Sequence, residues 1–267
     1  MTGEFKKIKV HYSDTGKGRV MVLLHGFLGS HKIWNQYIKK LSKKFRVIAI
    51  DLPGHGETPS IGYYHSTELL AQSVKAVLDH IGVRRYIIAG HSMGGYTALA
   101  FTELYPENIC GLCLIHSTAY ADTIEKRKDR DRLIKLVKKG RTEFVNEMIA
   151  NLFTPEYFSK FPKEVEKVQN IAAKISKQAI INSLEGMKER KSRDLILKFT
   201  EYPVLFIVGK KDTIINFETI YPQIGLCKYP TILMMENEGH MGFYESPKEP
   251  ISEIEKFSIR CFRGNFD

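Results

Sequence analysis

The segment around Ser92 constrains the fold of this chain more than any other stretch. An apolar run over residues 86–89, typical of a buried parallel strand, stops at Gly90, and a helical pattern begins at Thr97. Between them lies the pattern Gly-x-Ser-x-Gly. A strand that turns into a helix this quickly brings two backbone segments almost into contact, so only small residues fit at Gly90 and Gly94. The sequence therefore predicts a sharp turn that presents the Ser92 side chain at the carboxyl edge of a sheet.

Such a turn suits a nucleophile. The N-terminal N–H groups of the following helix point at whatever approaches Ser92, and their partial positive charge favours a developing negative charge. A tight packing turn and a phosphate cradle are the alternative interpretations of the bare pattern. The strand before the motif and the helix after it favour the nucleophile.

The rest of the chain alternates between strand and helix patterns. Residues 5–12 alternate between apolar and polar, and residues 13–18 carry the Gly-rich signal of a hairpin leading into a strand at 20–24. Further strands are predicted at 45–50, 109–115, 204–208 and 231–235, and helices at 33–41, 67–81, 97–104 and 250–262. An antiparallel start followed by this alternation predicts an α/β fold, with a mostly parallel twisted sheet and helices on both faces.

The alternation breaks between residues 119 and 199. This block has helical periodicity and no strand-like run, so we expect residues 1–118 and 200–267 to form the core and residues 119–199 to form an inserted helical cap. Residues 119–200 hold 19 Lys and Arg against 12 Asp and Glu, which is +7 of the chain's net charge of +10. The basic balance raises the possibility of a nucleic-acid partner. Interleaved acidic residues and the lack of a recognisable motif favour a lysine-rich solvated surface instead.

Length and composition narrow the classes further. A chain of 267 residues with 43% hydrophobic residues can bury the core of one large domain. No apolar stretch approaches the ~20 residues of a membrane span, and the N-terminus lacks the apolar segment of a secretory signal. We therefore expect a cytoplasmic protein. Cys110 and Cys113 have C-x-x-C spacing but lie on a predicted strand, where their side chains face opposite sides. Buried free thiols are the better interpretation for them than a redox pair or a zinc site.

A serine nucleophile needs a base, and the base needs an orienting carboxylate. Only His116 and His240 follow Ser92 in the chain. His116 closes a strand and precedes every plausible carboxylate. His240 lies in a glycine-flanked loop after the last predicted strand, from which it can return to the edge that holds Ser92, so His240 is the predicted base. Asp212 follows a strand directly and is the predicted acid, with Asp122 as the alternative.

Acyl transfer also requires donors for the developing oxyanion. The backbone N–H groups of Met93, directly after Ser92, and of Phe27, in the loop after the strand at 20–24, are the predicted donors. The side chains of His25, His55 and His91 are expected to hold loops beside the site. The side chains that could form the wall of an apolar acyl pocket are Tyr120, Phe153, Tyr157, Phe158 and Met187, each of which could equally pack inside the cap.

At this point the chain resembles the α/β-hydrolase superfamily. The matching segments are His25-Gly-Phe27, Asp51-Leu-Pro-Gly-His-Gly56, Gly90-His-Ser-Met-Gly-Gly95, Gly209-Lys-Lys-Asp212 and Gly239-His240. They follow the superfamily's order of nucleophile, acid and base, over essentially the whole chain. The resemblance implies a serine hydrolase without cofactor or metal, with Ser92, Asp212 and His240 as the triad. A serine nucleophile argues against the dehalogenase and epoxide hydrolase members, whose nucleophile is Asp.

Several functions remain compatible with this fold. Hydrolysis of carboxylic esters with small or medium acyl groups through an acyl-serine intermediate is the first hypothesis. A carbon–carbon bond hydrolase or a menaquinone-pathway type synthase is the second, because the basic cap, with Arg127, Arg130 and Arg190, would suit an anionic substrate or an acidic acyl-carrier partner. A non-enzymatic ligand receptor on the same fold is the third. Neither a nucleic acid nor a membrane span is expected.

Overall fold

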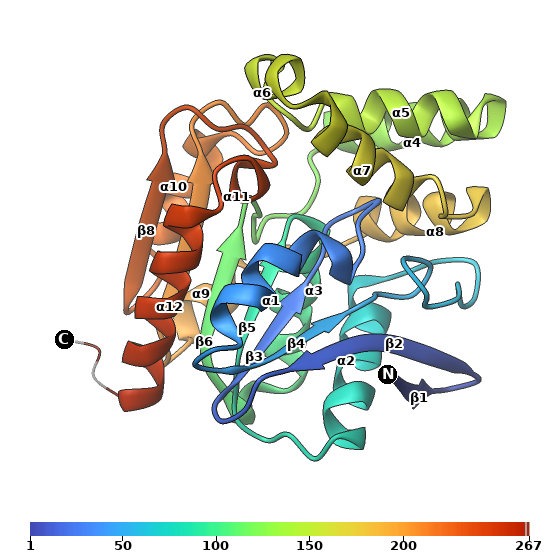
Figure 1. Cartoon of the computed structure of the whole chain (residues 1–267). Coiled ribbons are helices and arrows are strands. Elements are labelled where there is room, and N and C mark those ends of the chain that lie inside the picture. The colour runs from blue at the N-terminus through green and yellow to red at the C-terminus, as the bar shows by residue number, and fades with distance from the viewer. Residues whose placement is uncertain (265, 267) are drawn as a thin grey trace.

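The computed structural model describes residues 1–264 and residue 266. Within them the chain forms one sheet of eight strands (Figure 1). The strands are β1 (Thr2–Phe5), β2 (Ile8–Thr15), β3 (Val20–Leu24), β4 (Arg46–Ile50), β5 (Tyr86–His91), β6 (Ile109–Ile115), β7 (Val204–Gly209) and β8 (Pro230–Met235). Their order across the sheet is β1-β2-β4-β3-β5-β6-β7-β8. From β4 to β8 in this order, each strand is parallel to the next. Strand β2 is antiparallel to both β1 and β4. The predicted α/β class is confirmed.

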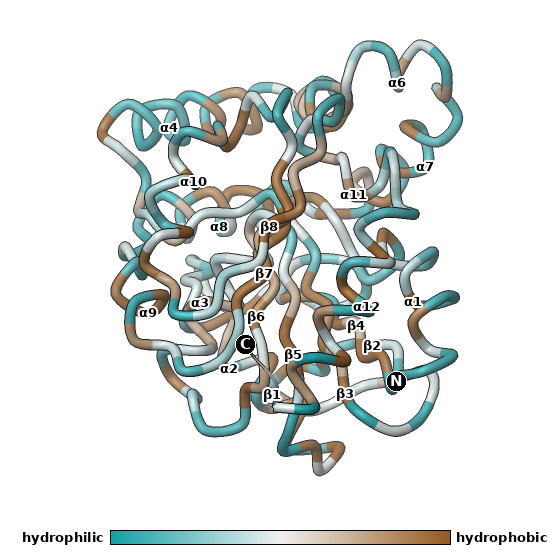
Figure 2. The backbone as a smooth tube through the Cα atoms, turned by 90° about the vertical axis from the view of Figure 1, so that its left-hand side faces the viewer, coloured by the Kyte–Doolittle hydropathy of each residue, from teal (hydrophilic) through white to brown (hydrophobic). Residues whose placement is uncertain are grey.

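Helices cover both faces of the sheet. The elements are η1 (His31–Trp34), α1 (Asn35–Leu41), α2 (Thr67–His80), α3 (Met93–Leu104), η2 (Pro106–Asn108), α4 (Ile124–Lys139), α5 (Arg141–Ala150), α6 (Pro155–Lys160), α7 (Pro162–Ala172), α8 (Lys177–Lys188), α9 (Asp194–Phe199), α10 (Phe217–Ile224), α11 (Gly242–Glu245) and α12 (Lys248–Arg263). Helices α1 and α12 lie on one face, and α2, α3 and α9 lie on the other (Figures 1 and 2).

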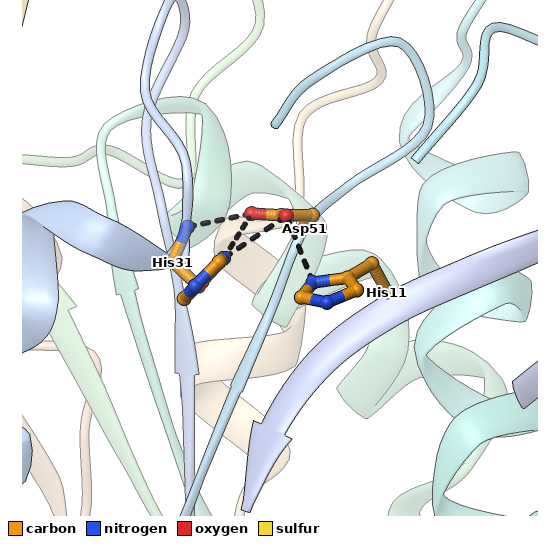
Figure 3. Close-up of side chains that lie close together, drawn as sticks. All are labelled: His11, His31 and Asp51. Atoms are coloured by element: carbon orange, nitrogen blue, oxygen red, sulfur yellow. Dashed lines mark hydrogen bonds and ion pairs between the residues drawn. The ribbon is translucent and has the colours of Figure 1, made fainter. Parts of the chain in front are cut away.

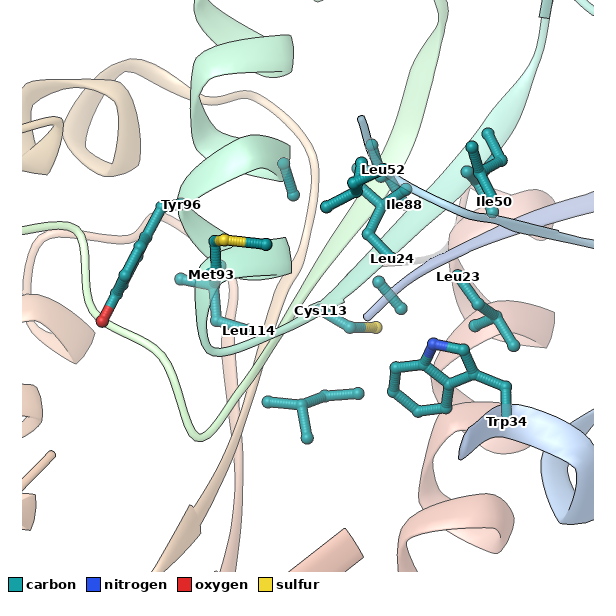
Figure 4. Close-up of a cluster of buried hydrophobic side chains, with 14 of the residues drawn as sticks. Leu23, Leu24, Trp34, Ile50, Leu52, Ile88, Met93, Tyr96, Cys113 and Leu114 are labelled. Atoms are coloured by element: carbon teal, nitrogen blue, oxygen red, sulfur yellow. The ribbon is translucent and has the colours of Figure 1, made fainter. Parts of the chain in front are cut away.

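The core lies between the sheet and these helices. Every residue of β3, β5, β6 and β7 is buried, as expected for parallel strands covered on both faces. Figure 4 shows how Trp34, at the end of η1, packs close to Leu23 and Cys113 on one side of the sheet, while Met93 and Tyr96 of α3 lie on the other. This packing holds the carboxyl ends of the central strands in fixed positions.

The N-terminal hairpin differs from the prediction. The expected hairpin at residues 13–18 does not pair the strands it connects, because β2 pairs with β4 and β3 lies between β4 and β5. The true hairpin turns at Lys6, whose φ is 53°, and joins β1 to β2. The apolar run of β3 gains more from a central position, buried on both faces, than from pairing with its half-exposed neighbour.

The segment between β6 and β7 holds α4 to α9. Helices α4 to α8 lie above the carboxyl ends of the strands, where an inserted cap was expected (Figure 1). Helix α9 instead lies beside α3, on one face of the sheet (Figures 1 and 2). Because β6 and β7 are parallel, the chain must return from the carboxyl end of β6 to the amino end of β7. Helix α9 forms part of this crossover. The part of the segment that covers the strand ends is therefore shorter than residues 119–199.

Two other expectations can be checked directly. Cys110 and Cys113 on β6 are buried and free, as predicted, and so are Cys227 and Cys261. Among the described residues, no helix has the length and apolar character needed to cross a bilayer.

Candidate active site

Ser92 occupies the turn between β5 and α3. Its φ of 50° and ψ of −113° are unfavourable for a residue with a side chain, and packing around the turn maintains them. A Cβ on Gly90 would overlap the backbone of Gly94, and one on Gly94 would overlap the carbonyl of Leu24. The Ser92 carbonyl accepts a hydrogen bond from Ser117 Oγ at 2.9 Å. The glycines thus permit the close approach that the sequence predicted, and Ser117 fixes the turn from the neighbouring strand.

Three side chains from separate loops meet at this turn. His240, in the loop before α11, places Nε2 2.9 Å from Ser92 Oγ. Its Nδ1 lies 2.8 Å from the Oδ2 of Asp212, which follows β7. All three residues are at most 8% exposed. The structure therefore brings together the serine, histidine and aspartate that the sequence nominated. It does not include Asp122, the alternative acid, which instead pairs with Arg190 inside the cap.

Asp212 is held as a carboxylate. Burial alone would raise the pKa of Asp212, but the charge of His240 and the contacts with His116 and His240 outweigh it and hold this pKa well below its usual value. The backbone N–H groups of Ile214 and Ile215 donate to its Oδ1 at 2.8 and 2.9 Å. An ionised Asp212 accepts the Nδ1 proton of His240 and leaves the Nε2 lone pair facing Ser92 Oγ.

Two more histidines surround this group. His91 Nε2 donates to the backbone carbonyl of His240 at 3.0 Å, which anchors the loop that carries His240. His116, with a φ of 45°, places Nδ1 3.5 Å from Asp212 Oδ2. Burial lowers the pKa of both His91 and His116, and the neighbouring charge on His240 lowers it further. Both rings therefore stay neutral at neutral pH, and His91 acts on the loop rather than on Ser92.

The loop after β3 reaches the same turn. Gly26 packs against the His91 ring, where a Cβ would overlap Nδ1. The N–H of Gly29 donates to the Gly26 carbonyl at 3.0 Å, closing a turn in which Leu28 has a φ of 62°. Among the described residues, no protein acceptor takes the backbone N–H of Phe27 or of Met93. The two predicted oxyanion donors are thus unengaged on segments adjacent to Ser92.

The nearby loop histidines have structural contacts. His25 Nδ1 donates to the Gly26 carbonyl at 2.8 Å, and its Nε2 accepts the N–H of Leu52 at 3.0 Å. His55 Nδ1 lies 3.3 Å from the Pro53 carbonyl. Burial lowers the pKa of His25 and of His55, so both are neutral side chains that hold loops together.

A cavity of about 450 Å³ opens between the cap and the core. It is lined by His240, by Lys211, by Phe153 in the loop between α5 and α6, and by Phe158 on α6. Tyr157 stacks on Phe153, with ring centroids 5.5 Å apart.

Two other pocket candidates, Tyr120 and Met187, and the serine itself do not line this cavity. Tyr120 and Met187 sit beside Arg190, to which each gives its backbone carbonyl. Ser92 is not among the cavity-lining residues, so His240 is the catalytic-group candidate that this cavity reaches.

The arginines considered for an anionic substrate are engaged within the cap. Arg130 and Arg190 contact the two carboxylate oxygens of Asp122 at 3.1 and 2.6 Å, and Arg127 pairs with Glu189. The Arg190 guanidinium also lies 4.0 Å from the ring centroid of Tyr96 on α3. These contacts hold the three arginines within the cap, and the cationic side chain that lines the cavity is Lys211.

With this geometry in view, the comparisons with known proteins are informative. A profile of the alpha/beta hydrolase fold family matches residues 19–247. The chain belongs to this family. The α/β hydrolase is 28% identical over 272 residues to the AB hydrolase superfamily protein YisY of Bacillus subtilis (strain 168), covering 96% of this chain and 99% of that protein.

Two further relatives differ in their stated activity. A thermophilic esterase from Thermogutta terrifontis is 27% identical with a TM-score of 0.89, covering 97% of this chain and 95% of that chain. A 2-hydroxy-6-oxononadienedioate/2-hydroxy-6-oxononatrienedioate hydrolase of Paraburkholderia phymatum is 38% identical over 115 residues, which is 41% of this chain and 40% of that protein.

The sequence did not reveal several contacts of the site. Ser117 and His116 both follow β6, and their place after a strand beside β5 was the signal that could have found them. Thr154 donates from its N–H and its hydroxyl to the two oxygens of Glu245, each at 2.8 Å. These residues are 91 positions apart, and no local pattern relates them.

Proposed function

We propose that this α/β hydrolase cleaves carboxylic esters with small or medium acyl groups through an acyl-Ser92 intermediate. The observation that carries the proposal is the continuous chain of contacts from Asp212 through His240 to Ser92 Oγ, with distances of 2.8 and 2.9 Å. A serine hydroxyl at this distance from an oriented imidazole can lose its proton as it attacks a carbonyl carbon.

The steps follow from the positions of the groups. His240 Nε2 takes the Ser92 proton, and the N–H groups of Phe27 and Met93 stabilise the oxyanion of the tetrahedral intermediate. His240 then returns the proton to the leaving alcohol as the acyl-serine forms. A water molecule, deprotonated by the same nitrogen, attacks the acyl-serine, and His240 returns this proton to Ser92 Oγ as the bond to the acyl group breaks and the acid is released. Asp212 keeps the imidazole oriented and stabilises its positive charge throughout.

The cavity beside His240 supports the proposed substrate class, because His240 lines it and places Nε2 2.9 Å from Ser92 Oγ. A volume of about 450 Å³ suits a small or medium ester, and Phe153 and Phe158 offer apolar surface for an acyl chain. The relationship to a solved esterase over nearly the whole of both chains supports ester hydrolysis. The carbon–carbon hydrolase alternative has less support, because the cap arginines invoked for its anionic substrate are paired with carboxylates.

A labelling experiment followed by a substrate series tests the proposal. We expect a fluorophosphonate probe to modify Ser92, located by peptide mass spectrometry, and the Ser92→Ala variant to remain unlabelled. Across p-nitrophenyl acetate, butyrate, octanoate and palmitate, we expect kcat/KM to be highest for the shorter chains. Absence of both labelling and turnover would refute the proposal. Cleavage of a 2-hydroxy-6-oxo-dienoate without ester turnover would support the carbon–carbon hydrolase instead.

A further inference from the structure

A second cluster of chemically capable side chains lies away from Ser92. His11 on β2, His31 at the start of η1 and Asp51 after β4 bring two imidazole rings and a carboxylate together (Figure 3). We propose that these three residues bind one divalent transition-metal ion, with Zn²⁺ as the reference case, through His11 Nδ1, His31 Nδ1 and the Asp51 carboxylate. The mechanism proposed for Ser92 does not use this cluster.

The spacing of the three groups fits a small cation. One ligand atom from each residue lies within 4.8 Å of the other two. Asp51 Oδ2 is 3.3 Å from His11 Nδ1, and Asp51 Oδ1 is 2.9 Å from His31 Nδ1. Tetrahedral Zn²⁺ with bonds of about 2.0–2.1 Å separates its ligand atoms by about 3.3–3.4 Å. The two distances between the imidazoles and the carboxylate are therefore within about half an ångström of those around a bound ion, and the two imidazole nitrogens lie within 4.8 Å of each other.

The hydrogen bonding of His11 also points to a missing partner. His11 Nδ1 is buried, and among the described residues its one polar contact is Asp51 Oδ2 at 3.3 Å, which does not have hydrogen-bond geometry. Its other nitrogen, Nε2, lies 3.4 Å from the carboxylate of Glu57. A histidine that binds a metal through one nitrogen commonly presents the other N–H to a carboxylate, which fixes the tautomer and the ring orientation. Glu57 is in position to do this and leaves the Nδ1 lone pair directed at the cluster.

The carboxylate is held in place before any ion binds. Asp51 is fully buried, and its oxygens accept the backbone N–H of His31 at 2.6 Å and of Glu57 at 3.0 Å. Gly56, with a φ of 57°, packs so closely on Asp51 that a Cβ there would overlap the carboxylate. In the metal-free protein a proton on His31 Nδ1 joins this ring to Asp51. A bound ion takes the place of that proton, which moves to Nε2 or to solvent.

The cluster is open to solvent on one side. A cavity of about 220 Å³ is lined by His31, Asp51 and Glu57, and Lys174 of the cap lies at its border. Water from this cavity completes the coordination of an ion held by three protein ligands. Asp51 and Glu57 supply negative charge beside the ion, while Lys32, which lies 3.9 Å from Glu57, and Lys174 line the same cavity and oppose it in part.

The ion would connect three segments that lie apart in the sequence. These are the strand β2, the turn that opens η1 and the loop after β4. The residue after Asp51, Leu52, donates its N–H to His25, which in turn holds the carbonyl of Gly26. The proposed site therefore adds a structural cross-link next to the loop that carries Phe27.

Titration of Zn²⁺ into the full-length protein, dialysed first against EDTA, tests the proposal. We expect calorimetry to give one ion per chain. The His11→Gln and His31→Gln variants should each bind at least about tenfold more weakly, and Glu57→Gln about tenfold more weakly through its outer contact. His80→Gln, an exposed histidine on α2, is the matched control and should bind like the unmodified chain.

Thermal unfolding provides a second readout that does not depend on ester turnover. At a hundredfold excess of Zn²⁺ over the Kd of the unmodified chain, we expect its Tm to rise by about 5 °C, and the Tm of His11→Gln to rise by no more than about half of that, because a tenfold weaker site is stabilised by about half as much free energy. Equal binding by all variants, or no binding by the unmodified chain, would overturn the proposal. Loss of binding in His240→Gln alone would place the ion at Ser92 and overturn it as well.

Discussion

The sheet and the cap are built on different principles. Every residue of β3 is buried, whereas in the 16 residues of α4 only Ile134 and Val137 are buried. Figure 2 shows the contrast as hydrophobic strands beneath largely hydrophilic cap helices. The apolar burial that stabilises the sheet is non-directional and spread over many residues. The cap helices also contribute to the apolar cluster, most of all α8, but α4 contributes little, and polar contacts add to this packing.

These polar contacts join the cap segment to the core at separate places. Arg193, before α9, reaches Glu68 on α2 and Glu103 on α3 at 2.6 and 2.9 Å. On α8, Ser183 contacts His65 at 3.2 Å. Packing in the core therefore fixes the positions of Ser92, Asp212 and His240, while a small number of polar contacts set how the cap covers these residues. Changes in the two regions should therefore affect different measurements.

The largest effect is expected from a change in the core that leaves packing intact. Asp212→Asn keeps the shape of the side chain but no longer stabilises the correct tautomer and charge of His240. We expect kcat for a p-nitrophenyl ester to fall by about 10⁴-fold, with KM nearly unchanged. Asp131→Asn, an exposed cap residue that pairs with Lys188, is the control and should keep full activity. A loss below tenfold for Asp212→Asn would contradict the role given to this carboxylate.

The next effect separates buried from exposed contacts within the cap. Arg190 and Asp122 form a pair whose side chains are 3% and 1% exposed, so Arg190→Ala removes the shorter of the two ion pairs of this buried carboxylate and leaves the contact with Arg130. We expect the free energy of unfolding, measured in urea, to fall by about 3–5 kcal/mol. Arg127→Ala removes a pair whose side chains are both 45% exposed and should cost less than about 1 kcal/mol. Similar losses of unfolding free energy in the two variants would contradict the distinction between buried and exposed ion pairs of the cap.

A pH dependence of stability is expected where the cap joins the core. Burial lowers the pKa of His65 from 6.5 to about 4, so the folded protein resists protonation that the unfolded chain accepts. Stability is therefore fully present above pH 6.5 and is lost as the pH falls toward 4. At pH 5 the loss from His65 alone is about 2 kcal/mol. His65→Gln should flatten this part of the stability profile, and His80→Gln should not.

A smaller effect is expected at the edge of the cavity. Thr154→Val removes the hydroxyl contact with Glu245 that links the start of α6 to α11, at a cost of about 1 kcal/mol. Easier opening of the cap should raise kcat/KM for octanoate relative to acetate by up to about fivefold. Thr123→Val, which removes the hydroxyl that caps the N-terminus of helix α4, is the control. An unchanged ratio for Thr154→Val would show that this contact does not limit access.

The same contrast explains what could be predicted from the sequence. The strands and the turn at Ser92 could be predicted because apolar runs and glycines determine the backbone conformation of short segments. The placements of Asp212 and His240 followed because the carboxyl ends of parallel strands share one edge of the sheet. The pairing of β2 with β4 was missed, since strand partners depend on burial across the whole sheet and not on the nearest turn signal.

The cap was less readable for a physical reason. Contacts such as Thr154 with Glu245 join residues far apart in sequence, and their polar side chains leave no periodic pattern. Helical periodicity located α4 to α8 but could not tell which aromatic side chains face the cavity. The position of α9 beside α3 follows from the crossover between β6 and β7, which only the sheet order reveals.

The placement of the cap between two adjacent strands has a consequence for evolution and engineering. Since β6 and β7 pair directly, the register of the sheet does not depend on how many residues leave and return between them. This connection can be shortened, extended or replaced from another member of the family while the strand ends keep their positions.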